Sequence, residues 1–147
     1  MNTRSLLIGI CAVAVVAGIA YWQTRPQALL APSASAPTAT AGGPMVAVTV
    51  PGLSSNAALG QRLYDTACAS CHGANAAGVE GTAPPLVHIY YEPNHHGDEA
   101  FQRAVAIGVT SHHWRFGNMP AQTGLTRGDV AMIITYIREL QRANGIR

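Results

Sequence analysis

The sequence predicts an all-α fold, in which a small helical domain follows an N-terminal transmembrane helix and a disordered linker. Apolar residues recur at helical spacing in three segments after position 54, and no segment there reads as a convincing strand. Before position 54, an apolar run is followed by a stretch rich in Pro, Ala and Thr, which cannot build a packed core. We therefore divide the chain into an anchor or signal peptide (1–25), a flexible linker (26–53) and a folded domain (54–147).

The N-terminal segment contains an uncharged run, Leu6–Trp22, at the short end of the lengths that span a bilayer. Small residues at Gly18 and Ala20 also fit a cleavable signal peptide. Tyr21 and Trp22 suit the headgroup interface, which favours a retained anchor. We predict a single-pass protein of the inner membrane with its domain in the periplasm. If the segment is cleaved, we expect a soluble periplasmic protein instead.

The linker at 26–53 contains five prolines and no apolar period, so we expect it to stay unfolded. Val46–Val50 alternates weakly in polarity, but it lies between prolines and has no evident partner strand, so we expect coil. A tether of this composition lets a folded domain move between sites along one membrane surface.

The first helix of the domain is expected from position 54 to about Ala69. Residues 54–56 offer three candidate capping side chains. Leu59, Leu63 and Tyr64 then follow at the spacing of one helix face.

Two further helices have clear boundary signals. Residues 98–107 begin with two acidic residues, which suit a helix N-terminus, and stop at Gly108. Thr126 and Asp129 form a capping box in front of an apolar stripe that stops at Asn144. We expect these helices to complete the domain.

The distribution of charge excludes one class of partner. All nine basic residues are arginines, and from position 54 onward seven arginines are matched by seven acidic residues. A nucleic-acid-binding surface needs a basic patch that displaces counterions from phosphates. We therefore expect no nucleic-acid partner.

The segment CASCH carries the strongest chemical signal in the chain. It places Cys68, Cys71 and His72 in the five-residue pattern typical of covalent haem attachment. A thioredoxin-like motif would need a βαβ context, and a structural zinc site would need two further ligands at suitable spacing. We predict one haem c, bound through Cys68 and Cys71, with His72 as an axial iron ligand.

A second axial ligand is expected from the loop RFGNMPAQ. Met119 lies there between Gly117 and Pro120, outside any helical pattern, as expected of a loop that delivers a thioether to iron. His112 and His113 are the alternative ligands.

From about Leu59 to Ala143 the sequence resembles class I monohaem cytochromes c, through CASCH, GTAPPL, GNMP and the two terminal helices. The resemblance implies that the Pro84 carbonyl accepts a hydrogen bond from the axial histidine. It also implies that Leu86 packs against the haem.

The same resemblance implies that Gly60 and Tyr64 on the first helix pack against Tyr136 on the last. Trp114 and Arg115, which precede the loop of the methionine, are candidate donors to haem propionates.

The expected function is electron transfer rather than catalysis, because an iron with histidine and methionine on both sides has no open position. We expect redox protein partners: a respiratory donor complex or dehydrogenase, and a terminal oxidase or reductase. The protein itself is expected not to be an enzyme, although it can be a subunit of an oxidoreductase complex. One alternative is a haem-based ligand sensor or peroxidase with a labile Met119.

Another alternative, a copper-handling cytochrome, rests on a surplus of histidines: His88, His95, His96, His112 and His113. These residues could hold a second metal or form a pH-dependent docking surface. However, a helix of ten residues is about 15 Å long and separates the two histidine pairs. They can converge only if the later loop folds back, so we expect surface or propionate-bonding histidines.

Overall fold

The computed structural model describes residues 42–147. The predicted anchor at 1–25 and the linker residues up to 41 lie outside the described residues. Within residues 42–147, no helix is both long enough and apolar enough to cross a membrane.

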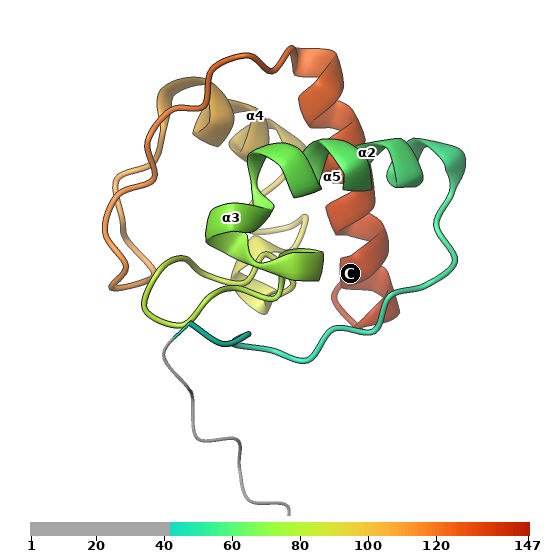
Figure 1. Ribbon diagram of the computed structural model, residues 1–147, viewed down its shortest axis with the longest axis horizontal. Helices are drawn as coiled ribbons and strands as arrows, with labels where there is room; N and C mark the ends of the chain where they lie inside the picture. Colours follow the sequence, from blue (N-terminus) through green and yellow to red (C-terminus); the bar gives the residue numbers. More distant parts are fainter. Residues whose placement is uncertain (1–41) are drawn as a thin grey trace, which may run out of the picture. The chain divides into compact units, whose positions relative to one another are not determined.

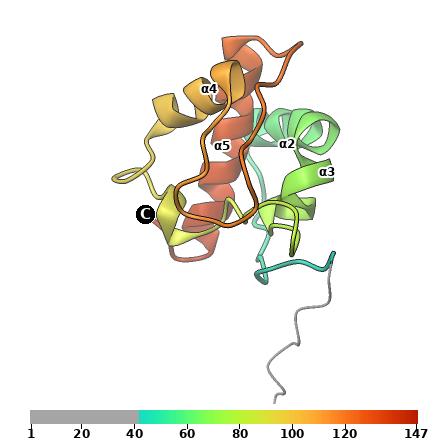
Figure 2. The same cartoon turned by 90° about the vertical axis from the view of Figure 1, so that its left-hand side faces the viewer.

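The described chain is helical, as predicted. Its helices are α2 (Ser55–Ala67), α3 (Ala69–His72), α4 (Asp98–Ile107) and α5 (Arg127–Ala143), joined by the short 3-10 turns η1 (Ala74–Ala76) and η2 (Ile89–Tyr91). Residues 42–147 contain no strand, only isolated β-bridges of Val79 with Ala83 and of Val109 with Met119. Helix α2 crosses in front of α5 in Figure 1, and α4 packs against α5 (Figure 2).

The crossing of α2 and α5 depends on a glycine and two tyrosines. At Gly60 the backbones are so close that an added Cβ would lie 1.9 Å from the carbonyl oxygen of Met132. Tyr64 and Tyr136 are fully buried, with ring centroids 5.5 Å apart. The packing implied by the resemblance is therefore present.

The helix ends largely follow the predicted signals. Ser54 caps α2 by accepting a hydrogen bond from the N–H of Ala57. Thr126 and Asp129 form the predicted capping box at the start of α5, and Asn144 caps the end of that helix. Helix α4 has the predicted bounds.

The first helix is shorter than expected. It was predicted to run to about Ala69, but α2 ends at Ala67, and Cys68 leaves the helical region with φ −123° and ψ −33°. The N–H groups of Cys71 and His72 then donate to the Cys68 carbonyl, which starts the separate turn α3. The attachment motif therefore occupies a bend and a short turn instead of the end of one long helix.

The segment 42–53 differs from the prediction of a flexible linker. The N–H groups of Met45 and Val46 both donate to the Ala77 carbonyl, at 3.1 and 3.2 Å. The backbone N–H and carbonyl of Thr49 form two hydrogen bonds with the side-chain amide of Asn144. Val48 and Leu53 pack against the core. The predicted coil state is correct for Val46–Val50, but these long-range contacts hold the segment in place.

Candidate haem-binding site

Cys68 and Cys71, the predicted attachment cysteines, lie at the bend between α2 and α3 and within α3, respectively. Both thiols are free, and Cys71 is exposed whereas Cys68 is half-buried. Burial raises the pKa of Cys68 to about 11, with a smaller contribution from Cys71, so Cys68 is protonated at neutral pH. Two cysteines two residues apart, directly before a histidine, are the arrangement that thioether attachment of a haem requires.

His72, at the end of α3, is buried and has a fixed orientation. Its Nδ1 lies 2.8 Å from the Pro84 carbonyl oxygen. Since a carbonyl only accepts, Nδ1 carries the proton and Nε2 keeps its lone pair. Burial lowers the pKa of His72, partly opposed by the bond to Pro84, which favours the neutral ring. A neutral, oriented imidazole is suited to bind a metal.

Close backbone contacts hold the loop after His72 in a conformation that places Pro84 next to His72. Gly73 has a φ of +74°, and a Cβ there would lie 2.6 Å from the Gly78 carbonyl oxygen. The hydroxyl of Tyr64 donates to the Gly73 carbonyl at 2.8 Å. Leu86, implied as a haem-packing residue, is buried in the hydrophobic core, and its N–H donates to Ala76.

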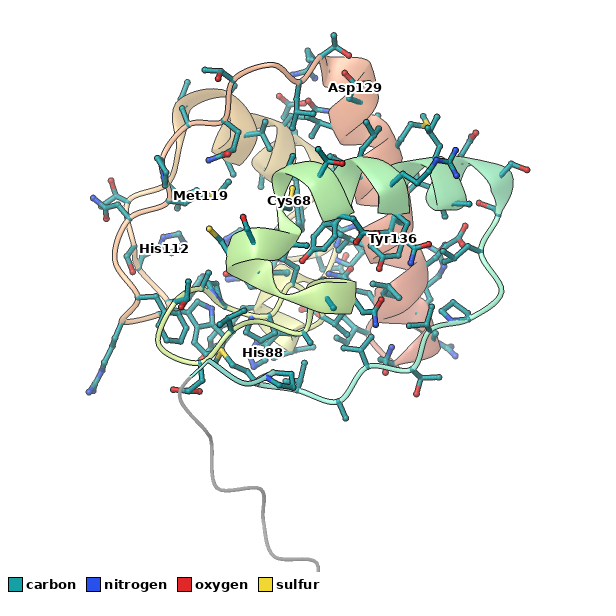
Figure 3. The ribbon with its side chains drawn as sticks, in the orientation of Figure 1. Cys68, His88, His112, Met119, Asp129 and Tyr136 are labelled. Carbon is teal, nitrogen blue, oxygen red and sulfur yellow. The ribbon has the colours of Figure 1, made fainter. Side chains whose placement is uncertain are left out.

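Met119 is held by backbone pairing across its loop. It exchanges two hydrogen bonds with Val109, at 2.9 and 3.0 Å. Asn118 accepts a hydrogen bond from the N–H of Ser111, which closes the loop further. Figure 3 shows Met119 on this loop, level with Cys68 at the end of α2. The backbone pairing with Val109 and the bond from Ser111 to Asn118 therefore fix the position of the methionine within its loop.

Trp114 lies within an aromatic cluster on the same loop. Its ring centroid is 5.0 Å from His88, 5.5 Å from Tyr90 and 5.8 Å from Phe116. Sequence reasoning gave His88 no definite role and missed Tyr90, because no local spacing connects η2 to the loop of Trp114. Arg115 is exposed and forms no hydrogen bond or ion pair with any part of residues 42–147.

Comparison with known protein families matches residues 57–141, more than half of the chain, to the family described as Cytochrome c. The chain belongs to the cytochrome c family. This membership confirms the predicted cofactor, covalently bound haem c, and supports a haem-based electron carrier in general. A search of curated proteins finds no significant match.

The residues of this cytochrome fit such a haem. The indole nitrogen of Trp114 is buried and forms no hydrogen bond of normal geometry with the described residues, although it lies close enough to Tyr91 to lower the pKa of that hydroxyl slightly against the larger effect of burial. An unpaired buried N–H costs about 1–3 kcal/mol, so the site favours an acceptor here, and a haem propionate is an acceptor of this kind. The thiols of Cys68 and Cys71 would form the thioether bonds of haem c, and the Nε2 atom of His72 would ligate its iron.

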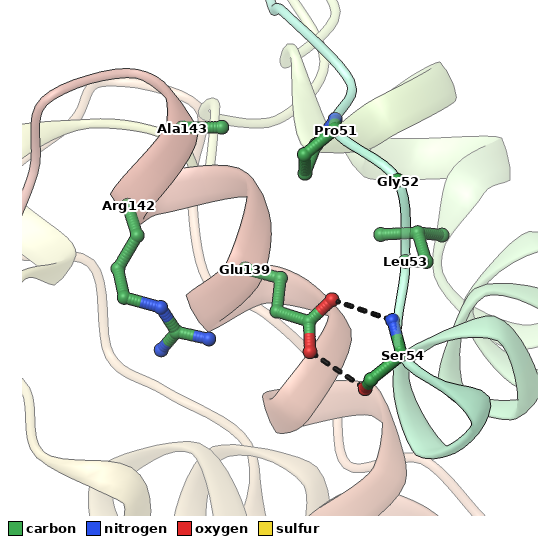
Figure 4. A pocket seen from close by; sticks show the side chains of 7 residues that line it. All are labelled: Pro51, Gly52, Leu53, Ser54, Glu139, Arg142 and Ala143. Carbon is green, nitrogen blue, oxygen red and sulfur yellow. Dashed lines mark hydrogen bonds between the residues drawn. The ribbon is translucent and has the colours of Figure 1, made fainter.

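The surface pocket shown in Figure 4 shares no residue with the predicted haem site of this cytochrome. It is lined by Pro51, Gly52, Leu53, Ser54, Glu139, Arg142 and Ala143. The Glu139 carboxylate accepts hydrogen bonds from the Ser54 N–H and hydroxyl, at 3.1 and 2.6 Å. These bonds join the start of α2 to α5, which gives the pocket walls a structural role.

Proposed function

We propose that this cytochrome carries single electrons through one haem whose iron is ligated by His72 and Met119. The observation that carries the proposal is the hydrogen bond from His72 to Pro84, because it leaves Nε2 as the unprotonated nitrogen. When bound, the haem supplies an iron that alternates between the ferric and ferrous states by one electron. Cys68 and Cys71 hold it through thioether bonds.

Met119 is proposed as the second axial ligand. Its support is the backbone pairing with Val109, which fixes the position of the loop. A methionine thioether raises the reduction potential of a haem iron. With both axial positions occupied, no position is open to oxygen or a substrate, so electron carriage is favoured over catalysis by this chain alone.

Four residues are proposed to shape the haem environment. Pro84 orients the axial imidazole, and Leu86 contributes apolar packing. Trp114 and Arg115 donate hydrogen bonds to the propionates. The unpaired indole nitrogen supports this role for Trp114, and the exposed, unpaired guanidinium leaves Arg115 free to take part.

We further propose that the domain exchanges electrons with other redox proteins at a membrane surface. The donor is a respiratory complex or dehydrogenase, and the acceptor is a terminal oxidase or reductase. Support for the location comes from the uncharged run Leu6–Trp22, which suits an inner-membrane anchor with the domain in the periplasm. If that run is a signal peptide, the protein is soluble in the periplasm.

Optical spectra of the full haem-loaded chain, oxidised and reduced, with and without carbon monoxide, test the proposed ligation. We expect a low-spin spectrum, the charge-transfer band of methionine-ligated ferric haem, and no change on adding carbon monoxide. Met119→Leu, which keeps the volume but removes a ligand, should abolish the band and admit carbon monoxide.

Met132→Leu is the matched control, because Met132 lies in α5 and is not expected to reach the iron. Its spectrum should be that of the unmodified protein. Ready binding of carbon monoxide by the unmodified protein would overturn the proposal in favour of a ligand sensor or peroxidase.

A further inference from the structure

The two histidine pairs, predicted to lie at opposite ends of α4, are close together. The loop from 108 to 119 folds back, so that the Nε2 atoms of His95 and His113 are 3.2 Å apart. The ring of His96 is 5.2 Å from that of His113, and the ring of His112 is 4.3 Å from it. His112 lies on this loop beside Met119 in Figure 3. Neither pair is part of the proposed haem ligation.

We propose that His95, His96 and His113 form a second metal site, which binds a divalent transition-metal ion such as Zn²⁺. One ligand atom from each residue lies within 4.8 Å of the other two. Tetrahedral Zn²⁺ with bonds of about 2.0–2.1 Å places its ligand nitrogens about 3.3 Å apart. The 3.2 Å between His95 and His113 already matches this spacing, and a ligand atom of His96 lies within 4.8 Å of both.

Protein groups behind the ligands orient two of the rings. The Nδ1 of His96 donates to the Tyr90 carbonyl at 2.6 Å, which leaves its Nε2 with the lone pair needed for a metal. The ring of His113 stacks on that of Tyr90, at 4.7 Å and 24°. A hydrogen bond from the second ring nitrogen to a carbonyl is the usual support of a metal-binding histidine.

The charged side chains around the three histidines are also compatible with a bound cation. Desolvation lowers the pKa of His113, and the neighbouring histidines add to this. Arg138 places a permanent positive charge nearby, since its guanidinium donates to the His96 carbonyl. It is paired with Asp98 at 2.9 Å, which offsets its charge.

The site would join two parts of the domain that are distant in sequence. His95 and His96 precede α4, whereas His113 is adjacent to Trp114 in the loop that also holds Met119. A metal bound to all three would fix this loop against the start of α4. Three histidine ligands leave the fourth position of Zn²⁺ to water or an external ligand.

Zinc uptake by the full haem-loaded chain tests the proposal, because Zn²⁺ is redox-inert and its binding can be measured separately from the haem iron. After incubation with zinc and desalting, we expect one zinc per iron by elemental analysis. Zinc K-edge absorption should show imidazole nitrogens at about 2.0 Å. Zinc should also raise the melting temperature, since a ligand of the folded state stabilises it.

His95→Asn and His113→Asn should each reduce the zinc content at least fivefold and remove the effect on melting. His112→Asn is the matched control, because His112 lies outside the three-residue set and its Nδ1 donates to Thr110. It should retain one zinc. Unchanged optical and circular-dichroism spectra of each variant verify that it folds.

Three results would overturn the proposal: no zinc uptake by the unmodified chain, uptake that survives both ligand substitutions, or loss of uptake in His112→Asn. The second result would mean adventitious surface binding, and the third would mean a different ligand set. None depends on the identity of the axial haem ligands, so this proposal and the proposed function can fail independently.

Discussion

Val109 and Met119 are joined by two hydrogen bonds, in which the N–H of each residue donates to the carbonyl of the other. This pairing closes a loop of nine intervening residues and fixes the backbone position of Met119, which carries the thioether. Gly108, directly before Val109, has a φ of +79°, and a Cβ there would lie 2.6 Å from the Met119 carbonyl oxygen. The position of the proposed ligand therefore depends on a glycine eleven residues away.

Gly108→Ala should weaken methionine ligation. The substitution combines a backbone conformation almost confined to glycine (φ +79°, ψ −177°), which costs about 1–3 kcal/mol for a residue with a Cβ, with a clash against Met119. We expect the methionine charge-transfer band to weaken and carbon monoxide to bind. Gly124→Ala has a similar positive φ but no atom within 4 Å of its Cβ, so it should lose stability without losing the band. Equal spectra for both variants would contradict the expectation.

Gly60→Ala should destabilise the crossing of α2 and α5. Its Cβ would clash with the Met132 carbonyl at 1.9 Å, and the two helices must separate to make room. We expect the free energy of unfolding to fall by about 3 kcal/mol, measured by denaturant titration of the haem-loaded protein.

The matched control is Gly128→Ala, also in a helix, whose Cβ would meet nothing closer than 3.6 Å. Helix propensity favours alanine there by up to about 1 kcal/mol, so this variant should be as stable as the unmodified protein or more so. If both substitutions had the same effect, close approach at Gly60 would not be the cause.

Glu139→Gln should reduce stability in a pH-dependent way. The hydrogen bonds from Ser54 hold the pKa of Glu139 below its ordinary value. Because the pKa of Glu139 is lower in the folded state, its carboxylate contributes fully to stability above the unfolded-state pKa of about 4.3. This contribution disappears as the pH falls through the folded-state pKa. The difference in unfolding free energy between the two proteins should therefore shrink below about pH 4.

The contribution should be small, because this hydrogen-bonded carboxylate lies at the surface. Glu80→Gln serves as the comparison, since the Glu80 side chain makes no hydrogen bond within the described part of the chain. A difference for Glu139→Gln that stays constant down to pH 2 would show that the carboxylate charge is not involved.

Trp114→Phe should lower the reduction potential while the low-spin spectrum persists. The substitution keeps an aromatic ring in the cluster but removes the N–H proposed to bind a propionate. A propionate that loses a donor keeps more of its negative charge, which favours ferric iron. We expect a fall of less than about 59 mV, the equivalent of a tenfold change for one electron, by redox titration.

Arg115→Ala extends this test to the second proposed donor. Because Arg115 is exposed, water screens its interaction, and its effect on the potential should be the smaller of the two. An unchanged potential in Trp114→Phe would remove the propionate role of the indole.

Features with local sequence signals were predicted well. The capping box of Thr126 and Asp129 and the glycine after α4 set helix boundaries through contacts between residues close in sequence. The packing of Gly60 and Tyr64 on Tyr136 came from family resemblance, since periodicity alone does not identify which faces of two helices meet. Leu59 shows that limit, because it follows the apolar spacing of α2 yet is 41% exposed.

Contacts between distant segments were not predictable in the same way. Thr49 and Asn144 are 95 positions apart, and nothing near either residue indicates that they bond. The convergence of the histidine pairs depends on the fold of the loop 108–119, which is closed by the bond from Ser111 to Asn118. Such pairings follow from the whole fold and leave no periodic trace in the sequence.

The contacts of segment 42–53 determine where the preceding chain joins the folded domain. Gly42 donates to the Glu80 carbonyl, so the chain leaves the domain beside the loop that follows the attachment motif rather than at the start of α2 (Figure 1). If the preceding residues are held at a membrane, this point of exit acts as a pivot. Under the proposed membrane anchoring, this exit point would restrict which faces of the domain can turn toward a partner on the same surface.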